Sequence, residues 1–152
     1  KNSADFIWMN FYTHVLTSQF LPKTPEIVLP ARKHETVTEF GYTMYPEGMI
    51  RATKWLSKLK IPIEVTENGV ADANESQRPK HIEMHLWMIS KLIADNVNIR
   101  SYYHWSLMDN FEWAEGYSMR FGLYHVDYES QKRTLRESGR LYQKLISTHL
   151  KR

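Results

Sequence analysis

Three short apolar runs in this sequence predict β-strands. They cover residues 4–12 (ADFIWMNFY), 61–66 and 99–106, and branched aliphatic or aromatic residues dominate each of them. Runs of this length and composition are typical of buried strands. We therefore expect three buried strands in this chain.

Between and after these runs, apolar residues recur every three or four positions, which predicts amphipathic helices. The first helix opens at Pro46, because proline suits the first turn of a helix. The second ends near Asp95 and Asn96, and the third covers roughly residues 135–150. The predicted apolar stripes are Met49, Ala52, Leu56 and Leu59 in the first helix, Ile82, Leu86, Ile89 and Ile93 in the second, and Leu141, Leu145 and His149 in the third.

The order of these elements predicts an α/β fold. Strands that alternate with amphipathic helices pair in parallel and are joined by right-handed crossovers. In a (β/α)8 barrel, catalytic residues lie at the carboxyl ends of the strands. All three predicted strands end in polar or aromatic residues, at positions 10–13, 66–69 and 105–113. Three such endings in succession favour one shared site.

A long segment at residues 13–41 separates the first strand from the first helix. Pro22, Pro25 and Pro30 interrupt regular structure there. A loop of this length in a compact domain is usually functional or in contact with a partner. We expect an irregular loop of that kind.

Composition narrows the class of protein. Hydrophobic residues make up 42% of the chain and charged residues 24%, with no apolar run of about 18 residues, so a membrane role is not expected. The net charge of +3 is scattered without a dense basic block, which argues against nucleic-acid binding. The absence of cysteine excludes disulfides, thiolate nucleophiles and Cys-based zinc sites, and it fits a reducing compartment.

The N-terminus, Lys1-Asn2-Ser3, has neither an initiator methionine nor a signal-like apolar segment. We interpret the chain as one that began further upstream, and we expect a cytoplasmic protein.

Two groups of polar residues have a simple structural interpretation. His81 and His85 share a helix face, but without a third ligand or an HExxH motif they do not predict a metal site. We expect surface or partly packed histidines, and neither a metal nor a cofactor. A solvated helical face is the expected setting of the basic residues Lys132, Arg133, Arg136 and Arg140.

One motif places a carboxylate at the end of a buried strand. Thr66-Glu67-Asn68-Gly69 follows the second apolar run directly. Taken alone, Glu67 is more readily interpreted as a loop cap or ion-pair partner than as a catalytic residue. Viewed singly, Tyr12 and Trp105 would be core aromatics, and Glu112 beside Trp113 would belong to a solvated loop. The individual residues leave both interpretations open.

The motif at residues 66–69 resembles the nucleophile motif of the family 1 glycoside hydrolases, the retaining β-glucosidases and their relatives. The resemblance continues in WSLMDNFEWAEGY at 105–117 and RFGLYHVD at 120–127. Upstream, residues 5–13 are similar to the sixth barrel strand of this family, and YPEG at 45–48 to its next helix start. The resemblance implies that residues 1–152 are the C-terminal portion of a TIM-barrel catalytic domain, with its last three βα units.

The resemblance also implies catalytic roles. Glu67 would be the nucleophile that forms a covalent glycosyl-enzyme intermediate, while a second carboxylic acid about 5–5.5 Å away protonates the leaving group. The Tyr12 hydroxyl would donate to the Glu67 carboxylate and hold its orientation. Asn10, two residues earlier on the same strand face, would lie near the catalytic carboxylates.

A sugar subsite is implied in the same way. Glu112 would accept hydrogen bonds from sugar hydroxyls, and the indole N–H of Trp113 would donate to another. Trp105 would form an apolar platform under the ring, with Phe121 closing the side of the pocket. This pair of Glu112 and Trp113 suits glucose, galactose or fucose, whereas the charge of Glu112 would repel a 6-phosphate.

Part of the machinery of this family is missing from the sequence. The acid/base Glu belongs to a Thr-x-Asn-Glu-Pro motif after an earlier strand, and no such motif occurs here. A full barrel usually has about 250 residues. We therefore expect a chain that hydrolyses β-glucosides only when an N-terminal barrel segment joins it. The alternative is a non-catalytic sugar-binding or structural fragment of a glycosidase barrel.

Overall fold

The computed structural model describes residues 3–15 and 33–149 and contains a parallel sheet of three strands in the order β1-β2-β3. These strands are β1 (Ile7–Asn10), β2 (Ile63–Asn68) and β3 (Ile99–His104), and each of the two pairings is parallel. The α/β prediction with parallel strands is confirmed. Pro22, Pro25 and Pro30, on which the prediction of an irregular loop depends, lie outside the described residues.

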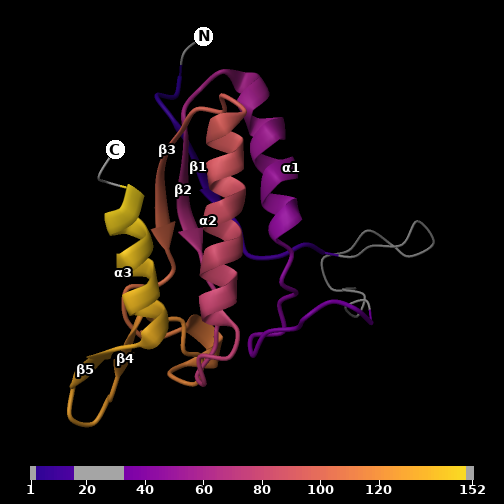
Figure 1. The fold of residues 1–152 in the computed structure, drawn as a ribbon. Helices are drawn as coiled ribbons and strands as arrows, with labels where there is room; N and C mark the ends of the chain where they lie inside the picture. The colour runs from indigo at the N-terminus through magenta and orange to yellow at the C-terminus, as the bar shows by residue number, and fades with distance from the viewer. Residues whose placement is uncertain (1–2, 16–32, 150–152) are drawn as a thin grey trace.

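Three α-helices accompany the sheet. They are α1 (Pro46–Leu56), α2 (Arg78–Ala94) and α3 (Glu137–His149), with α2 between the other two (Figure 1). Pro46 occupies the first turn of α1, as predicted, and a short 3-10 helix η1 (Ser57–Leu59) follows that helix. The loops that follow β2 and β3 lie together at the carboxyl ends of the strands (Figure 1).

The core lies between the sheet and the first two helices. Its buried members are Met9 from β1, Ile63 and Val65 from β2, Met49 from α1 and Ile89 from α2. Neighbouring residues of a strand point to opposite faces, so Trp8 and Tyr103 project from the other face of the sheet. Their exposed fractions are 71% and 56%. That face is therefore uncovered in the part of the chain that the structure describes.

The predicted stripe of α2 is only partly correct. Ile82 and Ile89 are buried, but Ile93 is 51% exposed. The buried arc of the helix instead includes His81 and His85, whose ring centroids lie 4.0 Å apart. Both histidines are at most 2% exposed, so the expectation of surface or partly packed histidines is wrong. The buried positions of α2 centre on these histidines, and the predicted apolar stripe lies along one edge of that arc.

The C-terminal third contains a hairpin that the sequence did not predict. The antiparallel strands β4 (Tyr124–Val126) and β5 (Arg133–Leu135) precede α3, which consequently begins at Glu137 rather than near residue 135. Arg136 is buried beside this hairpin, so its assignment to a solvated helical face is wrong. Lys132, Arg133 and Arg140 are exposed, as that assignment requires.

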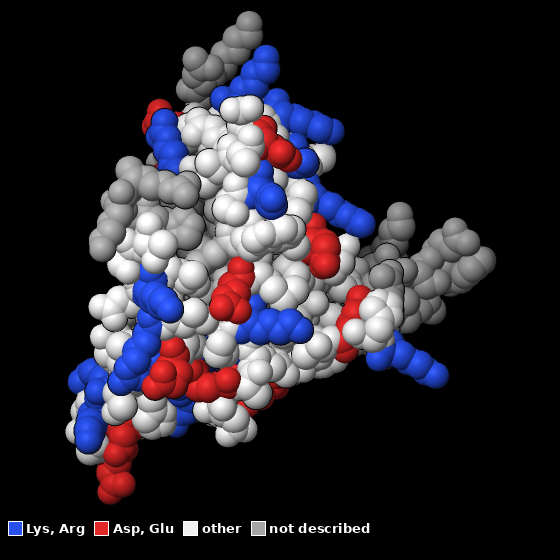
Figure 2. All heavy atoms as spheres, viewed as in Figure 1, with Lys and Arg blue, Asp and Glu red and all other residues white. Residues whose placement is uncertain are grey.

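Charged residues of both signs are scattered over the face shown in Figure 2. None of the described helices combines the length and the apolar composition needed to cross a membrane.

Candidate active site

Irregular pairing marks the end of β2. Asn10 of β1 pairs with Glu67, although the preceding pair is Met9 with Val65, so β2 carries one extra residue there. The pairing with β3 is also irregular between Val65 and Asn68. Bulges of this kind redirect side chains and are frequent beside active sites. Glu67 therefore projects from a strand end whose regular alternation is broken.

The side chain of Glu67 is held by Tyr12. The Tyr12 hydroxyl donates a hydrogen bond of 2.7 Å to Oε2 of Glu67. Burial is the largest cause that raises the pKa of Tyr12, and its hydrogen bond to the Glu67 carboxylate and the negative charge of that group add to it. Tyr12 therefore keeps its proton and remains a donor well above neutral pH.

Asn10 lies directly across from Glu67 in the sheet. Its side-chain oxygen accepts a hydrogen bond of 2.7 Å from the Thr66 hydroxyl. The residue is exposed at the strand end. Thr66, Glu67 and Asn10 thus form one polar group at the junction of β1 and β2.

Gly69 brings the end of β2 against the end of β3. A Cβ atom at this position would lie 1.8 Å from the carbonyl oxygen of Trp105. Only glycine allows that approach. The backbone N–H of Trp105 also donates to the carbonyl of Asn68 at 2.9 Å. Trp105 is therefore fixed beside the strand end that carries Glu67.

The remaining sugar-subsite candidates lie on the loop after β3. Glu112 is half-buried, and its negative charge contributes to raising the pKa of Tyr12 and of Tyr42, which places it within electrostatic reach of both. Phe121 is buried, with its ring edge-on to Tyr12 at 6.3 Å between centroids. Trp113 opens the 3-10 helix η2 (Trp113–Glu115) and is 85% exposed. Of these candidates, Trp113 is the one that projects outward.

Two aromatic residues at this site were missed by the sequence analysis. Tyr42 lies 5.9 Å from Tyr12 and 4.6 Å from Phe40, measured between ring centroids. They flank Gly41, whose φ of +81° favours glycine. The signal in the sequence was a glycine between two aromatic residues in a polar segment, which is unusual for a solvated turn.

The loop after β3 is anchored by a buried ion pair that the sequence also did not indicate. Asp109, 3% exposed, accepts hydrogen bonds from Arg136 at 2.8 and 3.0 Å. It also accepts from the backbone N–H groups of Gly122 and Val126. Burial opposes ionisation of Asp109, but the hydrogen bonds, with Arg136 foremost, outweigh it and hold its pKa below the usual value. The loop that carries Glu112 is thus tied to the start of α3.

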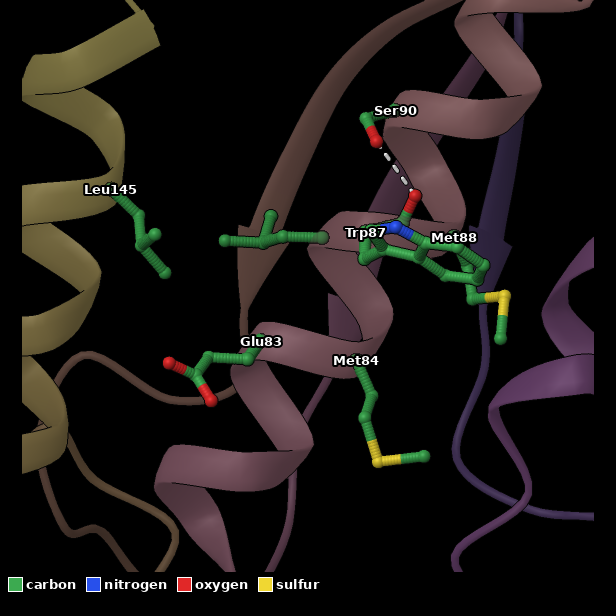
Figure 3. Close-up of a pocket in the computed structure, with 7 residues that line it drawn as sticks. Glu83, Met84, Trp87, Met88, Ser90 and Leu145 are labelled. Carbon is green, nitrogen blue, oxygen red and sulfur yellow. Dashed lines mark hydrogen bonds between the residues drawn. The ribbon is translucent and has the colours of Figure 1, made fainter.

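A pocket of about 590 Å³ lies elsewhere, on α2 facing Leu145 of α3 (Figure 3). None of the seven predicted site residues lines it; its lining residues are Glu83, Met84, Leu86, Trp87, Met88, Ser90 and Leu145. It is separate from the group around Glu67. Among the described residues there is also no set of three His, Asp or Glu side chains that could hold a metal ion.

The chain is similar to several curated enzymes. It is 39% identical to the β-galactosidase of Saccharolobus solfataricus over 97% of this chain and 32% of that enzyme. It is 35% identical to β-glucosidase A of Thermotoga maritima over 98% of this chain and 36% of that enzyme. The chain therefore spans about a third of the length of these relatives.

Solved structures agree with this similarity. The β-glucosidase of Pyrococcus furiosus superposes with a TM-score of 0.86 at 34% identity, over 95% of this chain and 33% of that one. The family 1 β-glucosidase of Thermotoga maritima gives a TM-score of 0.83 at 34% identity, over 94% and 34%. The model of glycosyl hydrolase family 1 matches residues 1–151. The chain therefore belongs to glycosyl hydrolase family 1.

Proposed function

We propose that this chain supplies the nucleophile and part of the sugar subsite of an enzyme that hydrolyses β-D-glucosides and related β-glycosides with retention of configuration. The observation that carries the proposal is the Glu67 carboxylate at the end of β2, oriented by the Tyr12 hydroxyl at 2.7 Å. Glu112 and Phe121, on the loop after β3, lie near the same tyrosine. A nucleophile and sugar-binding groups would thus be held by neighbouring strand ends.

In the proposed mechanism the ionised Glu67 attacks the anomeric carbon while a second carboxylic acid protonates the leaving oxygen. The bond from the anomeric carbon to the leaving group breaks, and a glycosyl ester on Glu67 forms. Water, activated by the same second carboxylate, then releases the sugar. Tyr12 donates to Oε2 of Glu67, which leaves Oε1 available for the attack.

The second carboxylic acid is proposed to come from a companion segment. The Thr-x-Asn-Glu-Pro motif does not occur in the sequence. In the proposed assembly, β1, β2 and β3 with their helices are the last three βα units of the barrel, and an N-terminal segment contributes the first five strands. The exposed aromatic side chains Trp8 and Tyr103 support this arrangement, because a completed barrel would enclose that face.

The names of the relatives support β-glycosides as the proposed substrates. Those of similar sequence are named β-galactosidase, β-glucosidase and 1,4-β-D-glucan glucohydrolase. The β-glucosidase of Thermotoga maritima has been solved in complex with glucoimidazole, at 32% identity to this chain. A half-buried carboxylate at Glu112 suits neutral sugars that present hydroxyl donors.

Covalent labelling tests the proposal. The chain is combined with the N-terminal segment and incubated with a 2-deoxy-2-fluoro β-glucoside that carries a good leaving group, and the peptides are analysed by mass. We expect one fluoroglycosyl group on Glu67, together with hydrolysis of a chromogenic β-glucoside. The chain with Glu67→Gln is the matched control and should remain unlabelled.

The alternative, a non-catalytic sugar-binding or structural fragment, predicts a different result. An assembled barrel that binds glucose but shows neither label nor hydrolysis would support that alternative and overturn the catalytic proposal.

A further inference from the structure

We infer that Asn68 is a positioning residue for Glu67, because its buried amide holds β2 to both neighbouring strands at the irregular strand end from which the nucleophile projects. The inference rests on the proposed function, since it assigns Asn68 a part in the chemistry of Glu67. It concerns a residue that is fully buried and whose side chain bonds to other protein groups.

The amide of Asn68 makes two hydrogen bonds in opposite directions across the sheet. Its side-chain nitrogen donates to the backbone carbonyl of Phe11 after β1 at 2.7 Å, and its side-chain oxygen accepts from the Tyr102 hydroxyl in β3 at 2.9 Å. The carbonyl of Phe11 can only accept, so the amide has one possible orientation. Burial raises the pKa of Tyr102, which therefore remains a donor.

These bonds add side-chain connections at the point where the pairing of β2 is irregular. An extra residue in one strand interrupts the regular ladder and leaves part of the backbone without its usual partner. Around this point the N–H of Phe11 donates to the carbonyl of Glu67 at 2.9 Å, and the N–H of Trp105 donates to the carbonyl of Asn68 at 2.9 Å. Asn68 supplies the side-chain bonds that complete the connection to both neighbours.

The contacts form a closed path through the nucleophile. Asn68 fixes the carbonyl of Phe11, and the peptide bond of that carbonyl leads directly into Tyr12. The hydroxyl of Tyr12 then returns to the carboxylate of Glu67, the residue before Asn68. A shift of Asn68 would therefore move both the nucleophile and the hydroxyl that orients it.

The burial and chemistry of Asn68 separate it from the catalytic residues. It is 0% exposed, so it holds other groups in place and does not contact the sugar. An aspartate here would lose the N–H donor and set a carboxylate against the Phe11 carbonyl. An alanine would leave that carbonyl and the Tyr102 hydroxyl without their partner.

The test uses the completed assembly of this chain and its companion segment with three variants. Asn68→Ala removes both bonds, and Tyr102→Phe removes one hydroxyl with little change in volume. Tyr142→Phe is the matched control, because its ring lies 6.3 Å from that of Tyr102 and its hydroxyl is not among the partners of Asn68. For each variant we measure kcat, KM, the rate of labelling by the fluoroglucoside and the thermal unfolding midpoint.

We expect kcat and the labelling rate to fall about 100-fold in Asn68→Ala and about tenfold in Tyr102→Phe, since displacement of a reacting group by about 1 Å can cost 100-fold. KM should stay within about threefold, because most of the proposed sugar contacts lie on the loop after β3. Tyr142→Phe should retain the kcat of the unmodified assembly. A purely structural role would instead lower the unfolding midpoint and leave the kcat of the folded fraction unchanged.

Retention of kcat within about twofold in folded Asn68→Ala would overturn the inference, and if that variant does not fold, the same result in Tyr102→Phe would do so. An unmodified assembly that is never labelled would overturn the proposed function and this inference with it. If the unmodified assembly is active but its Asn68→Ala and Tyr102→Phe variants keep the same kcat, only the role of Asn68 is overturned.

Discussion

The hydroxyl of Tyr12, 2.7 Å from Oε2 of Glu67, orients the proposed nucleophile by a direct hydrogen bond. In the proposed assembly with an N-terminal segment, Tyr12→Phe should lower kcat by about 10- to 100-fold, because a hydrogen bond to a charged group contributes about 1.5–3 kcal/mol. Steady-state hydrolysis of a chromogenic β-glucoside measures the loss. Tyr117→Phe, on an exposed ring, is the control and should change kcat less than twofold. Equal activity of the two variants would contradict the role of Tyr12.

Glu112 should exclude phosphorylated sugars. Its charge already acts on Tyr12 and Tyr42, and a 6-phosphate at the same place would meet a like charge. We expect Glu112→Ser to shift the ratio of kcat/KM for a 6-phospho-β-glucoside over a β-glucoside upward by about tenfold or more. Glu115→Ser, exposed at the end of η2, controls for a general loss of charge. An unchanged ratio in Glu112→Ser would count against the assignment.

At the scale of residues, the resemblance predicted one contact of the site, but nothing in the sequence indicated another. The resemblance pointed to Tyr12 and Glu67, which are 55 positions apart and meet in the structure. It gave no reason to pair Asp109 with Arg136, because a separation of 27 positions across a loop and a hairpin has no local signature. Charged residues of that kind look solvated in a sequence until the fold buries them.

At the scale of elements, the buried histidines of α2 and β3 make the stability of the fold depend on pH. Burial lowers the pKa of His85 to about 4 and that of His104 to about 3, and the pKa of His81 lies well below its usual value. In the unfolded chain each would titrate near 6.5. Between about pH 6.5 and 4 the unfolded state therefore binds more protons, so stability falls as pH falls through that window.

We expect the thermal unfolding midpoint to decline between pH 7 and 4.5, with each histidine contributing up to about 1.4 kcal/mol per pH unit. His85→Gln should reduce that slope. His34→Gln, at an exposed position, should not change it. A slope that is the same in all three proteins would show that these histidines do not set the acid sensitivity.

The hairpin and α3 depend on a buried charge. Arg136→Met would leave the buried carboxylate of Asp109 without its main partner, and breaking a buried pair in this way costs about 3–5 kcal/mol. Arg140→Met, which removes an exposed pair with Glu137, should cost less than about 1 kcal/mol. Urea denaturation compares the two free energies of unfolding. Similar losses would contradict the importance of burial.

The sequence predicted the positions of the helices better than it predicted which of their faces is buried. Spacing located α1 and α2, and Pro46 marked a start correctly, but Leu59 of the predicted first stripe lies beyond α1 in η1 and is exposed. The same spacing placed Ile93 on the buried face because it treats the histidines of α2 as polar. Strands β4 and β5 have three residues each, which is too short for an alternating pattern to be recognised.

At the scale of the whole molecule, the described sheet has one uncovered face and two strand edges, at β1 and β3. In the described residues β1 and β3 each pair only with β2. Addition of the N-terminal segment should slow hydrogen exchange of backbone amides in β1 and β3, whereas amides of β2 already have partners on both sides and should change least. Mass-spectrometric exchange measures this difference. Uniform rates before and after addition would contradict the proposed assembly.

The close approach at Gly69 has a mechanical consequence. A hydrogen bond can stretch when temperature or charge changes, but the contact between Gly69 and the Trp105 carbonyl is a hard limit set by atomic size. The gap between the ends of β2 and β3 is therefore nearly incompressible. If Glu67 and Trp105 take the proposed roles, this contact would set the closest approach of the strand ends that carry the nucleophile and the apolar platform, and a larger residue at position 69 would push the two apart.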